Sequence, residues 1–438
     1  MNSHSKKGMV YLVMKKKKRI CVISQGCRLN HSESAELMNK IKATEELQLT
    51  MDQSTDLVVI NTCTVTENGD KDTIRLVNKV NQTCKSVKIA LIGCQSQIKQ
   101  QQLLSLKNVN WVVGNQSKSD VMDIIMNQKP GSYMAPFTKE AFFQTSSFDP
   151  KHTRVNLKIQ DGCDFYCSFC IIPFARGPAR SRDFNDIVND AKQLHQLGIK
   201  ELILTGINLG TYENNGATFY DLLEAMLTIH PELQIRISSI EPTTVDERLI
   251  DFWNEFPNLC RYLHLPIQSA TNTILKKMRR KYTLLDYDNF ITAIKKKRPD
   301  ICIGTDVIVG FPGESDDLFH ETKTYLSESL IDYFHVFSYS ERTMAHSRKF
   351  DDQVPQHVIK QRSQTLRTVH LNKWQRFLNQ HVDTVQSILF EQKKNGVWVG
   401  TSDQFIKVRV QSEMALKNKR MSVRLTSVQD DFMYGELL

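Results

Sequence analysis

The sequence predicts an α/β protein of three parts. These are a parallel α/β sheet domain at the amino-terminal end, a central partial (β/α)6 barrel and a small all-β barrel at the carboxyl-terminal end. A chain of 438 residues exceeds what one hydrophobic core usually organises. Short apolar runs alternate with amphipathic stretches through most of the chain and become short alternating runs near its end. We expect domains at residues 18–130, 151–375 and 376–438, with a linker at 131–150.

The first domain is predicted from apolar runs that end at cysteines. The runs "RICVISQGC", "DLVVINTC" and "VKIALIGC" are typical of buried strands, with "WVVGN" as a fourth candidate, and polar amphipathic stretches follow them, as in βα units. Cys27, Cys63 and Cys94 therefore stand at the carboxyl ends of three strands, which lie along one edge of a parallel sheet. One such cysteine alone is most simply a small buried hydrophobe. Three in the same topological place predict a metal site.

The central domain is predicted from six further apolar runs. They lie at 155–159, 201–208, 233–240, 262–268, 301–310 and 333–339. Stretches with helical spacing separate them, such as "FNDIVNDAKQLHQLG", which ends at a glycine as helices often do. Six βα units are too few to close the usual eight-stranded barrel, so we expect a curved parallel sheet whose functional edge is again at the carboxyl ends of its strands.

The last domain and the linker are predicted from a change of pattern. "VDTVQSILFEQ", "GVWVGTSD", "FIKVRVQ" and "RMSVRLTSV" alternate at short range, which is compatible with a small β barrel. The linker "GSYMAPFTKEAFFQTSSFDP" has no periodicity and carries Gly, Pro and Ser near its ends.

Composition indicates an ordinary globular protein with 40% hydrophobic and 24% charged residues. No run of eighteen apolar residues exists and "MVYLVM" is too short for a signal peptide, so we expect a cytoplasmic protein without a membrane partner. Ten cysteines in a reducing compartment favour metal or redox chemistry over disulfides. A net charge of +9, with basic clusters spread along the chain, favours a large nucleic acid as partner.

The most specific motif is "CDFYCSFC" at 163–170, directly after the first strand of the central domain. No second CxxC pair is close enough in sequence to complete a zinc site. Thiolates at CxxxCxxC spacing can hold three irons of a 4Fe–4S cluster and leave the fourth iron open to another ligand. Cys163, Cys167 and Cys170 are therefore the predicted ligands and the catalytic centre.

This motif, after the first strand of a six-unit parallel barrel, resembles the radical S-adenosylmethionine superfamily. The resemblance implies that S-adenosylmethionine chelates the open iron and that Phe169 packs near its adenine. "GCRLNHSES", "NTCTVTENGDKD" and "GCQSQ" are similar to the cysteine motifs of the methylthiotransferase family, which implies a second 4Fe–4S cluster on the first cysteine triad. "LTGINLG", "RISSIEP", "HLPIQSA", "TDVIVGFPGE" and "HVFSYSER" resemble that family's barrel motifs, and the last domain resembles its RNA-binding TRAM domain.

Within that family, residues 158–182 are similar to the branch that adds a methylthio group to C2 of N6-threonylcarbamoyladenosine at position 37 of tRNA. Sibling branches act on N6-isopentenyladenosine in tRNA or on a ribosomal-protein aspartate, and a non-enzymatic iron–sulfur RNA-binding protein is a further alternative. The partners implied are the tRNA anticodon stem-loop, an electron donor such as flavodoxin or ferredoxin, and a sulfur source. At 343–347, "TMAHS" stands where the family commonly has a Gly-Thr pair, so substrate contacts do not carry over to that loop.

Further cofactor and substrate residues follow from the resemblance. Thr205 and Gly206 would contact the methionine amino group, and Ser239 and Glu241 lie where the ribose should sit. Gln268, after "HLPI", would project towards the same rim. Ordinary strand-end structure is the alternative for the first four.

Basic residues supply the remaining substrate candidates. Arg176 and Arg182 follow the cluster loop and suit phosphate oxygens, with an ion pair inside the fold as the alternative. Lys407 and Arg409 alternate on one predicted strand and could contact an RNA backbone. Trp398 is either a stacking face for a base or part of the barrel core.

Overall fold

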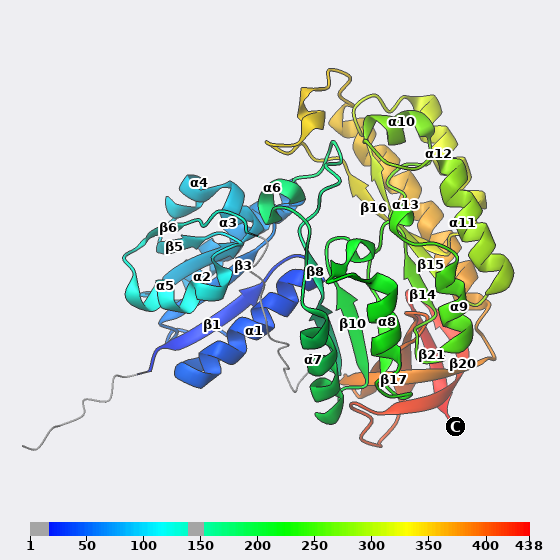
Figure 1. Cartoon of the computed structure of the whole chain (residues 1–438), viewed down its shortest axis with the longest axis horizontal. Helices are drawn as coiled ribbons and strands as arrows, with labels where there is room; N and C mark the ends of the chain where they lie inside the picture. Colours follow the sequence, from blue (N-terminus) through cyan, green and yellow to red (C-terminus); the bar gives the residue numbers. More distant parts are fainter. Residues whose placement is uncertain (1–16, 139–152) are drawn as a thin grey trace, which may run out of the picture.

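The computed structural model describes residues 17–138 and 153–438 (Figure 1). Three sheets follow one another along the chain, namely a six-stranded parallel sheet, a curved parallel sheet and a closed β barrel. The predicted fold class is confirmed. Within the two described segments, every helix is too short or too polar to span a lipid bilayer.

The first sheet has the order β2-β1-β3-β4-β5-β6 and all its pairings are parallel. Its strands are β1 (Arg19–Ser24), β2 (Glu46–Gln48), β3 (Leu57–Thr62), β4 (Lys88–Gly93), β5 (Val109–Val113) and β6 (Gly131–Tyr133). Its helices are α1 (Arg28–Thr44), α2 (Glu67–Thr83), α3 (Cys94–Ile98), α4 (Gln100–Leu104) and α5 (Val121–Asn127). Strand β3 is buried along its whole length because alternate side chains enter two different cores. Val59 packs in the core of α1 and α5, whereas Val58 and Ile60 pack in the core of α2.

The linker prediction needs a correction at its start. Residues 131–133 form β6 and pair with β5, so the sheet reaches into the segment that we expected to be a linker. A short edge strand is held by backbone hydrogen bonds and needs no apolar run, which is why periodicity does not reveal it. Residues 139–150 of the predicted linker lie outside the described residues.

The central sheet contains all six predicted strands. They are β7 (Arg154–Lys158), β10 (Glu201–Thr205), β13 (Gln234–Ile237), β14 (Tyr262–His264), β15 (Cys302–Val309) and β16 (Tyr333–Ser338). Two three-stranded halves, β7-β10-β13 and β14-β15-β16, are joined by parallel bridges at Ile235–Leu259 and Ser239–His264. The main helices are α7 (Phe184–Gln196), α8 (Phe219–Leu227), α9 (Arg248–Glu255), α11 (Leu284–Lys297), α12 (Asp316–Glu328) and α13 (Gln356–Asn379). They pack against the outside of the curved sheet (Figure 1).

Two short hairpins and two short helices lie between the strands and helices of this domain. They are the hairpin β8 (Gln160–Asp161) with β9 (Arg180–Ser181), the hairpin β11 (Glu213–Asn214) with β12 (Ala217–Thr218), and the helices α6 (Ile172–Arg176) and α10 (Asn272–Lys277). The cysteine loop lies between β8 and α6, so the hairpin and the helix hold its two ends.

The last sheet closes in the order β17-β18-β19-β21-β20. Its strands are β17 (Val385–Lys394), β18 (Val397–Ser402), β19 (Lys407–Gln411), β20 (Arg420–Gln429) and β21 (Phe432–Leu437). The fully buried Arg236 of β13 fixes the barrel to the central sheet, donating to the carbonyl oxygens of Ser402 (3.0 Å) and Asp403 (2.9 Å). Its Nε also donates to Oε1 of Glu201 at 2.6 Å, so the buried charge is paired.

Candidate active site

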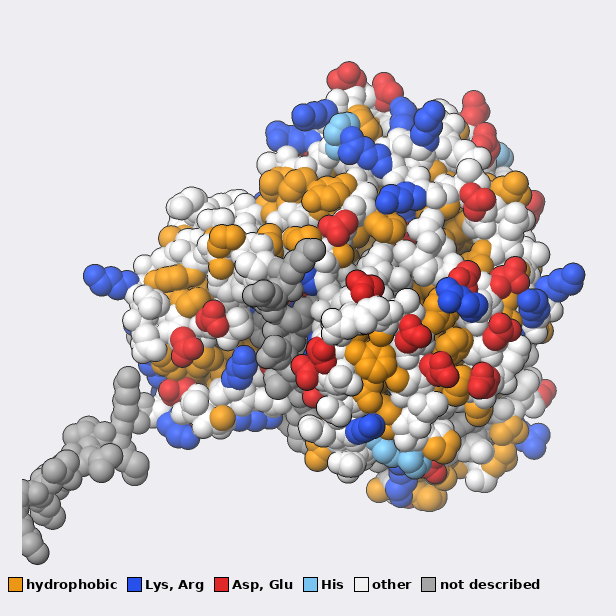
Figure 2. Space-filling model, viewed as in Figure 1, with side chains coloured by type: hydrophobic (Ala, Val, Ile, Leu, Met, Phe, Trp, Pro, Cys, Tyr) orange, Lys and Arg blue, Asp and Glu red, His pale blue; other side chains and the backbone are white. Residues whose placement is uncertain are grey.

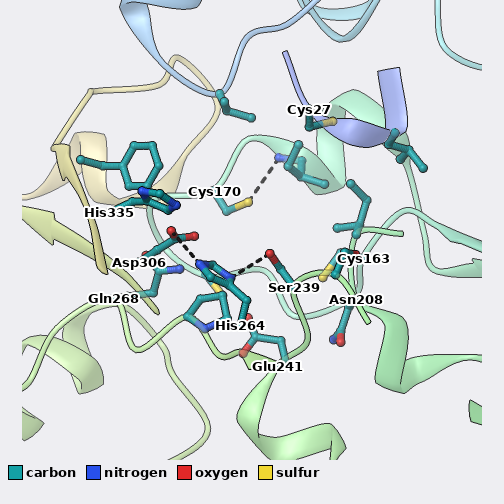
Figure 3. A pocket seen from close by; sticks show the side chains of 18 of the residues that line it. Cys27, Cys163, Cys170, Asn208, Ser239, Glu241, His264, Gln268, Asp306 and His335 are labelled. Carbon is teal, nitrogen blue, oxygen red and sulfur yellow. Dashed lines mark hydrogen bonds and ion pairs between the residues drawn. The ribbon is translucent and has the colours of Figure 1, made fainter. Parts of the chain in front are cut away.

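A cavity of about 760 Å³ opens at the carboxyl ends of the central strands, the edge at which the topology predicts the functional site. All three parts of the chain contribute to its wall. Cys27 comes from the start of α1, the cysteine loop forms one side, and Phe405 comes from the small barrel. Figure 3 shows the cysteines and the strand-end side chains around this space.

The loop with Cys163, Cys167 and Cys170 presents all three half-buried thiols to the cavity. Burial raises the pKa of Cys163 to about 11 and that of Cys170 to about 12, which disfavours their thiolate forms unless a cationic group binds them. Among the described residues, no set of three or more His, Cys, Asp or Glu side chains is placed to hold a metal ion. Three thiols at CxxxCxxC spacing that line one cavity are instead a donor set suited to three irons of a 4Fe–4S cluster.

Arg280 contacts this loop directly. Its Nη1 donates to Sγ of Cys167 at 3.2 Å, and its Nη2 is hydrogen-bonded to Oε2 of Glu241. Burial raises the pKa of Glu241, and Arg280 opposes this rise. The guanidinium thus lies between a predicted cluster ligand and a predicted cofactor contact. Sequence reasoning missed Arg280 because "MRRKY" gives no sign of which of its basic residues turns inward.

The first cysteine triad lies on the facing sheet edge. Cys27 caps the start of α1, Cys63 follows β3 and Cys94 begins α3. Gly26, with φ +93°, passes so close that a Cβ there would lie 2.6 Å from Cβ of Cys63. Burial raises the pKa of Cys63 to about 12. Cys27 lines the cavity and the other two cysteines are buried, so the triad meets at one edge as predicted while its cluster stays a prediction.

A buried ion-pair network joins α1, which follows Cys27, to β8 and α6, which flank the cysteine loop. Arg176 of α6 is 0% exposed, and its Nη1 lies 2.9 Å from Oε1 of Glu33 on α1 and 2.9 Å from Oδ1 of Asp161. Lys158 lies 3.0 Å from Glu33 and 2.8 Å from Asp161, and Lys118 lies 2.5 Å from Glu33. Burial alone would raise the pKa of Glu33, but the three cations hold it well below its usual range.

The predicted roles of Arg176 and Arg182 in substrate binding need a correction. Arg176 is enclosed in the network above, and Arg182 is buried and paired with Asp190. Both guanidiniums are therefore out of reach of a phosphate, and the alternative expectation of ion pairs inside the fold holds. Burial decides this outcome, and the short sequence around the cluster loop does not encode it.

The strand-end residues Thr205, Gly206, Ser239, Glu241 and Gln268 all line the cavity, as does Phe169 of the cysteine loop. Thr205 Oγ1 bonds to its own strand, at the carbonyl oxygen of Ile203. Oγ of Ser239 lies 2.9 Å from Nδ1 of His264, whose Nε2 lies 3.3 Å from Oδ1 of Asp306 (Figure 3). These three side chains offer a hydroxyl, an imidazole and a carboxylate group to a polar ligand. The role of each residue stays a prediction.

The basic candidates on the small barrel differ in exposure. Lys407 is exposed, whereas Arg409 is half-buried, stacked 3.7 Å from the centre of the Phe432 ring and bonded to the hydroxyl of Tyr434. Trp398 is 8% exposed and belongs to the barrel core, so it is no stacking face. Phe405 instead packs against Tyr262 at 5.0 Å in the cavity wall.

Comparisons with known proteins agree with this geometry. The model of the radical SAM superfamily matches residues 157–326, and that of the uncharacterized protein family UPF0004 matches residues 19–114. The threonylcarbamoyladenosine tRNA methylthiotransferase MtaB of Bacillus subtilis is 31% identical over 94% of this chain and 95% of its own. The chain belongs to the radical SAM tRNA methylthiotransferase family.

Two further proteins are similar to this chain at lower sequence identity. The tRNA-2-methylthio-N(6)-dimethylallyladenosine synthase of a Nitratiruptor species is 28% identical over 96% of this chain and 100% of its own. The radical S-adenosylmethionine methyltransferase TsrM of Kitasatospora setae has a similar fold, with a TM-score of 0.54 at 12% identity over 73% of this chain and 72% of its own. As a member of this family the protein is a transferase that uses S-adenosylmethionine and 4Fe–4S chemistry.

Proposed function

We propose that the protein adds a methylthio group to C2 of N6-threonylcarbamoyladenosine at position 37 of tRNA. One 4Fe–4S cluster would be held by Cys163, Cys167 and Cys170, and a second by the triad on the first sheet. The observation that carries the proposal is that thiols of both triads border one cavity, with Cys27 facing the cysteine loop across it. A reaction that attaches a methylated sulfur to one carbon needs the radical centre and the sulfur-carrying centre at the same substrate atom.

The residues of the cavity have separate tasks. When bound, the clusters and S-adenosylmethionine supply the one-electron chemistry that an unactivated C–H bond requires. Arg280 donates to Cys167 and orients Glu241, while Ser239 and His264 present a polar edge to the cofactor. Apolar side chains such as Phe169 and Ile308 line the same wall and exclude water. The anticodon loop offers its base unpaired, which lowers the cost of moving it into such a cavity.

The substrate branch is supported by the stretch 158–182 and by the name of the Bacillus subtilis relative. Within this stretch, Gln160 and Asp161 act on the loop's geometry. Nε2 of Gln160 donates to the carbonyl oxygen of Gly162 at 2.8 Å, and Asp161 binds Arg176. These side chains shape the cluster loop, so base selection belongs to other residues of the cavity.

The second candidate is the sibling reaction on N6-isopentenyladenosine. The Nitratiruptor relative, whose name describes that product, matches this chain along nearly its full length. The sheet, the cysteine triads and the barrel motifs are compatible with either base.

Nucleoside mass spectrometry separates these candidates. The gene is expressed in a host that lacks its own threonylcarbamoyladenosine methylthiotransferase, with Cys167→Ala as the matched control. We expect 2-methylthio-threonylcarbamoyladenosine only with the intact gene. Appearance of the isopentenyl product alone contradicts the substrate, and absence of any thiomethylated nucleoside from cluster-loaded protein contradicts the tRNA reaction and favours a ribosomal-protein aspartate. Loaded protein that binds S-adenosylmethionine but never cleaves it favours the non-enzymatic alternative.

We also propose a cytoplasmic location, a low-potential electron donor such as flavodoxin or ferredoxin, an external sulfur source, and the anticodon stem-loop as the RNA partner. A small β barrel with Lys407 and Arg409 on one strand supports the last of these, because cationic and aromatic side chains on such barrels bind single-stranded RNA. The domain boundaries stay predictions.

A further inference from the structure

A second groove lies outside the cysteine loop. It has a volume of about 470 Å³ and is lined by Cys167 and Cys170 of the loop, by Arg279, and by residues of the segment 343–349. These two cysteines border both this groove and the large cavity, so the loop separates the two spaces. The segment 343–349 contains the "TMAHS" stretch whose sequence departs from the family pattern.

The rim of this groove is positively charged. Arg279, Arg348 and Lys349 are all exposed, and His346 stands beside them. Arg348 is paired with Glu341 at 3.2 Å, but Arg279 and Lys349 have no carboxylate partner within the described segments. In the described part of the chain no carboxylate lines the groove. Figure 2 shows Lys, Arg and His side chains near the top of the molecule, over the loop that follows β16, with a few Asp and Glu side chains above them.

Apolar side chains lie exposed at the same place. Tyr166 is 49% exposed and Met344 is 48% exposed, although both are large hydrophobic residues. Tyr166 has a φ of +49° and packs edge-on against Phe174, so the loop holds it outward in a conformation that bulky residues rarely adopt. Exposed Tyr and Met beside unpaired Arg are typical of protein–protein contact surfaces.

We propose that this groove, defined by Tyr166, Arg279, Met344, Arg348 and Lys349, is the docking site of an acidic, low-potential electron-carrier protein. The inference rests on the proposed function, because it assigns the place where that reaction receives its electron. One electron passes from the reduced carrier to the oxidised cluster behind Cys167 and Cys170, so the carrier is oxidised by one electron, the cluster is reduced by one, and no bond is made or broken.

Two arguments favour an electron carrier over RNA here. A partner in the groove lies one loop's thickness from two iron-binding sulfurs, which matters for electron transfer because its rate falls steeply with distance. The target base, in contrast, must reach the large cavity on the other side of the loop. A small cationic rim also suits a transient redox encounter, in which complementary charge mainly accelerates association.

The test compares two reductants for the cluster-loaded enzyme. The variant Arg279→Glu/Arg348→Glu/Lys349→Glu is measured against Lys79→Glu/Lys85→Glu/Lys129→Glu, a control with the same charge change on exposed lysines of the first domain. Cleavage of S-adenosylmethionine is driven either by reduced flavodoxin or by dithionite, a small reductant that needs no docking. We expect the flavodoxin-driven rate of the groove variant to fall about tenfold or more at low ionic strength, with unchanged dithionite-driven rate, and the control to behave as wild type.

Other outcomes overturn the proposal. Equal flavodoxin-driven rates in the variant and wild type exclude docking at the groove, and a loss of tRNA affinity with both reductants equally effective assigns the groove to RNA. If dithionite fails to drive cleavage in the wild type, the proposed function fails. In that case the affinity of oxidised flavodoxin for the wild type and the groove variant still decides the docking site, and equal affinities overturn it. Met344→Glu, which changes no cation, should also weaken this affinity.

Discussion

At the scale of single residues, Arg280 has the most direct influence on the cysteine loop. A donor to a cluster sulfur and a positive charge beside the cluster both favour the reduced, more negative state. We therefore expect Arg280→Gln to shift the midpoint potential of the cluster on Cys163, Cys167 and Cys170 to more negative values, by tens of millivolts. Redox titration followed by electron paramagnetic resonance measures this shift without relying on turnover.

Glu241→Gln is the matched control because it removes the negative partner of the same pair. It should shift the potential in the opposite direction, with an unchanged iron content. A merely structural role for Arg280 would lower iron content in both variants and leave the potential of the remaining clusters unmoved.

The placement of the loop cysteines at the cavity could be predicted from the sequence and the burial of the arginines could not, for a physical reason. The spacing of the cysteines is set by the sequence itself, so CxxxCxxC can be recognised without knowledge of the tertiary structure. The role of Arg176 depends on whether α1 buries it, which depends on contacts between residues far apart in sequence. Likewise, the turn after α10 determines that Arg280, among the neighbouring basic residues, contacts the cysteine loop.

At the scale of elements, the turn between β1 and α1 controls the first triad. Gly26 has φ +93°, and an added Cβ would meet Cβ and Sγ of Cys63 at 2.6 and 2.9 Å. We expect Gly26→Ala to displace Cys63 and to remove about half of the iron from the purified protein, because the barrel loop is untouched. Iron analysis together with the paramagnetic signal of the remaining cluster checks this outcome.

Gly216→Ala provides the control for backbone strain. Gly216 also has a positive φ, +86°, but a Cβ there meets nothing within 4 Å. Both substitutions cost about 1–3 kcal/mol of strain, so an equal loss of iron in both would show that general destabilisation, and not the contact with Cys63, is responsible.

Elements with a continuous apolar run were predictable, and strands of mixed composition were not. All six central strands and the four runs of the first sheet appear where the pattern places them. Strands β2 and β6 lie at the edges of the first sheet, and β21 is the last strand of the barrel in the sequence. All three carry polar or mixed residues, so their positions depend on backbone pairing with neighbouring strands.

At the scale of the whole molecule, the network around Glu33 couples the first sheet to the cysteine loop. The cations depress the pKa of Glu33 and of Asp161 in the folded state, although burial opposes this. A depressed pKa stabilises the fold above the unfolded value, about 4.3 for Glu, and this stability is lost as pH falls through the folded value. We expect the free energy of unfolding to decline below about pH 4.5.

The variant Glu33→Gln tests this coupling. It leaves Arg176, Lys118 and Lys158 short of a counter-charge, so we expect a loss of about 3–5 kcal/mol at neutral pH and a shallower decline in acid. Urea unfolding at several pH values, on iron-free wild type and variant, measures both effects. A uniform loss with an unchanged pH profile would show that Glu33 is not ionised in the network.

The small barrel is a wall of the active site as well as a candidate RNA-binding surface, which determines how its RNA role can be tested. Deleting it would remove Phe405 from the cavity and leave Arg236 without two carbonyl acceptors, so a truncation would confound binding with folding. Point variants avoid this, because Lys407 and Arg424 are exposed and lie outside the barrel core. We expect Lys407→Glu/Arg424→Glu to weaken tRNA binding about threefold to tenfold and to flatten its salt dependence, with unchanged tRNA-independent cleavage of S-adenosylmethionine.

Lys417→Glu/Lys419→Glu, on the loop before β20, is the matched control for this variant. Equal losses of tRNA affinity in both pairs would show general charge attraction without a defined RNA face.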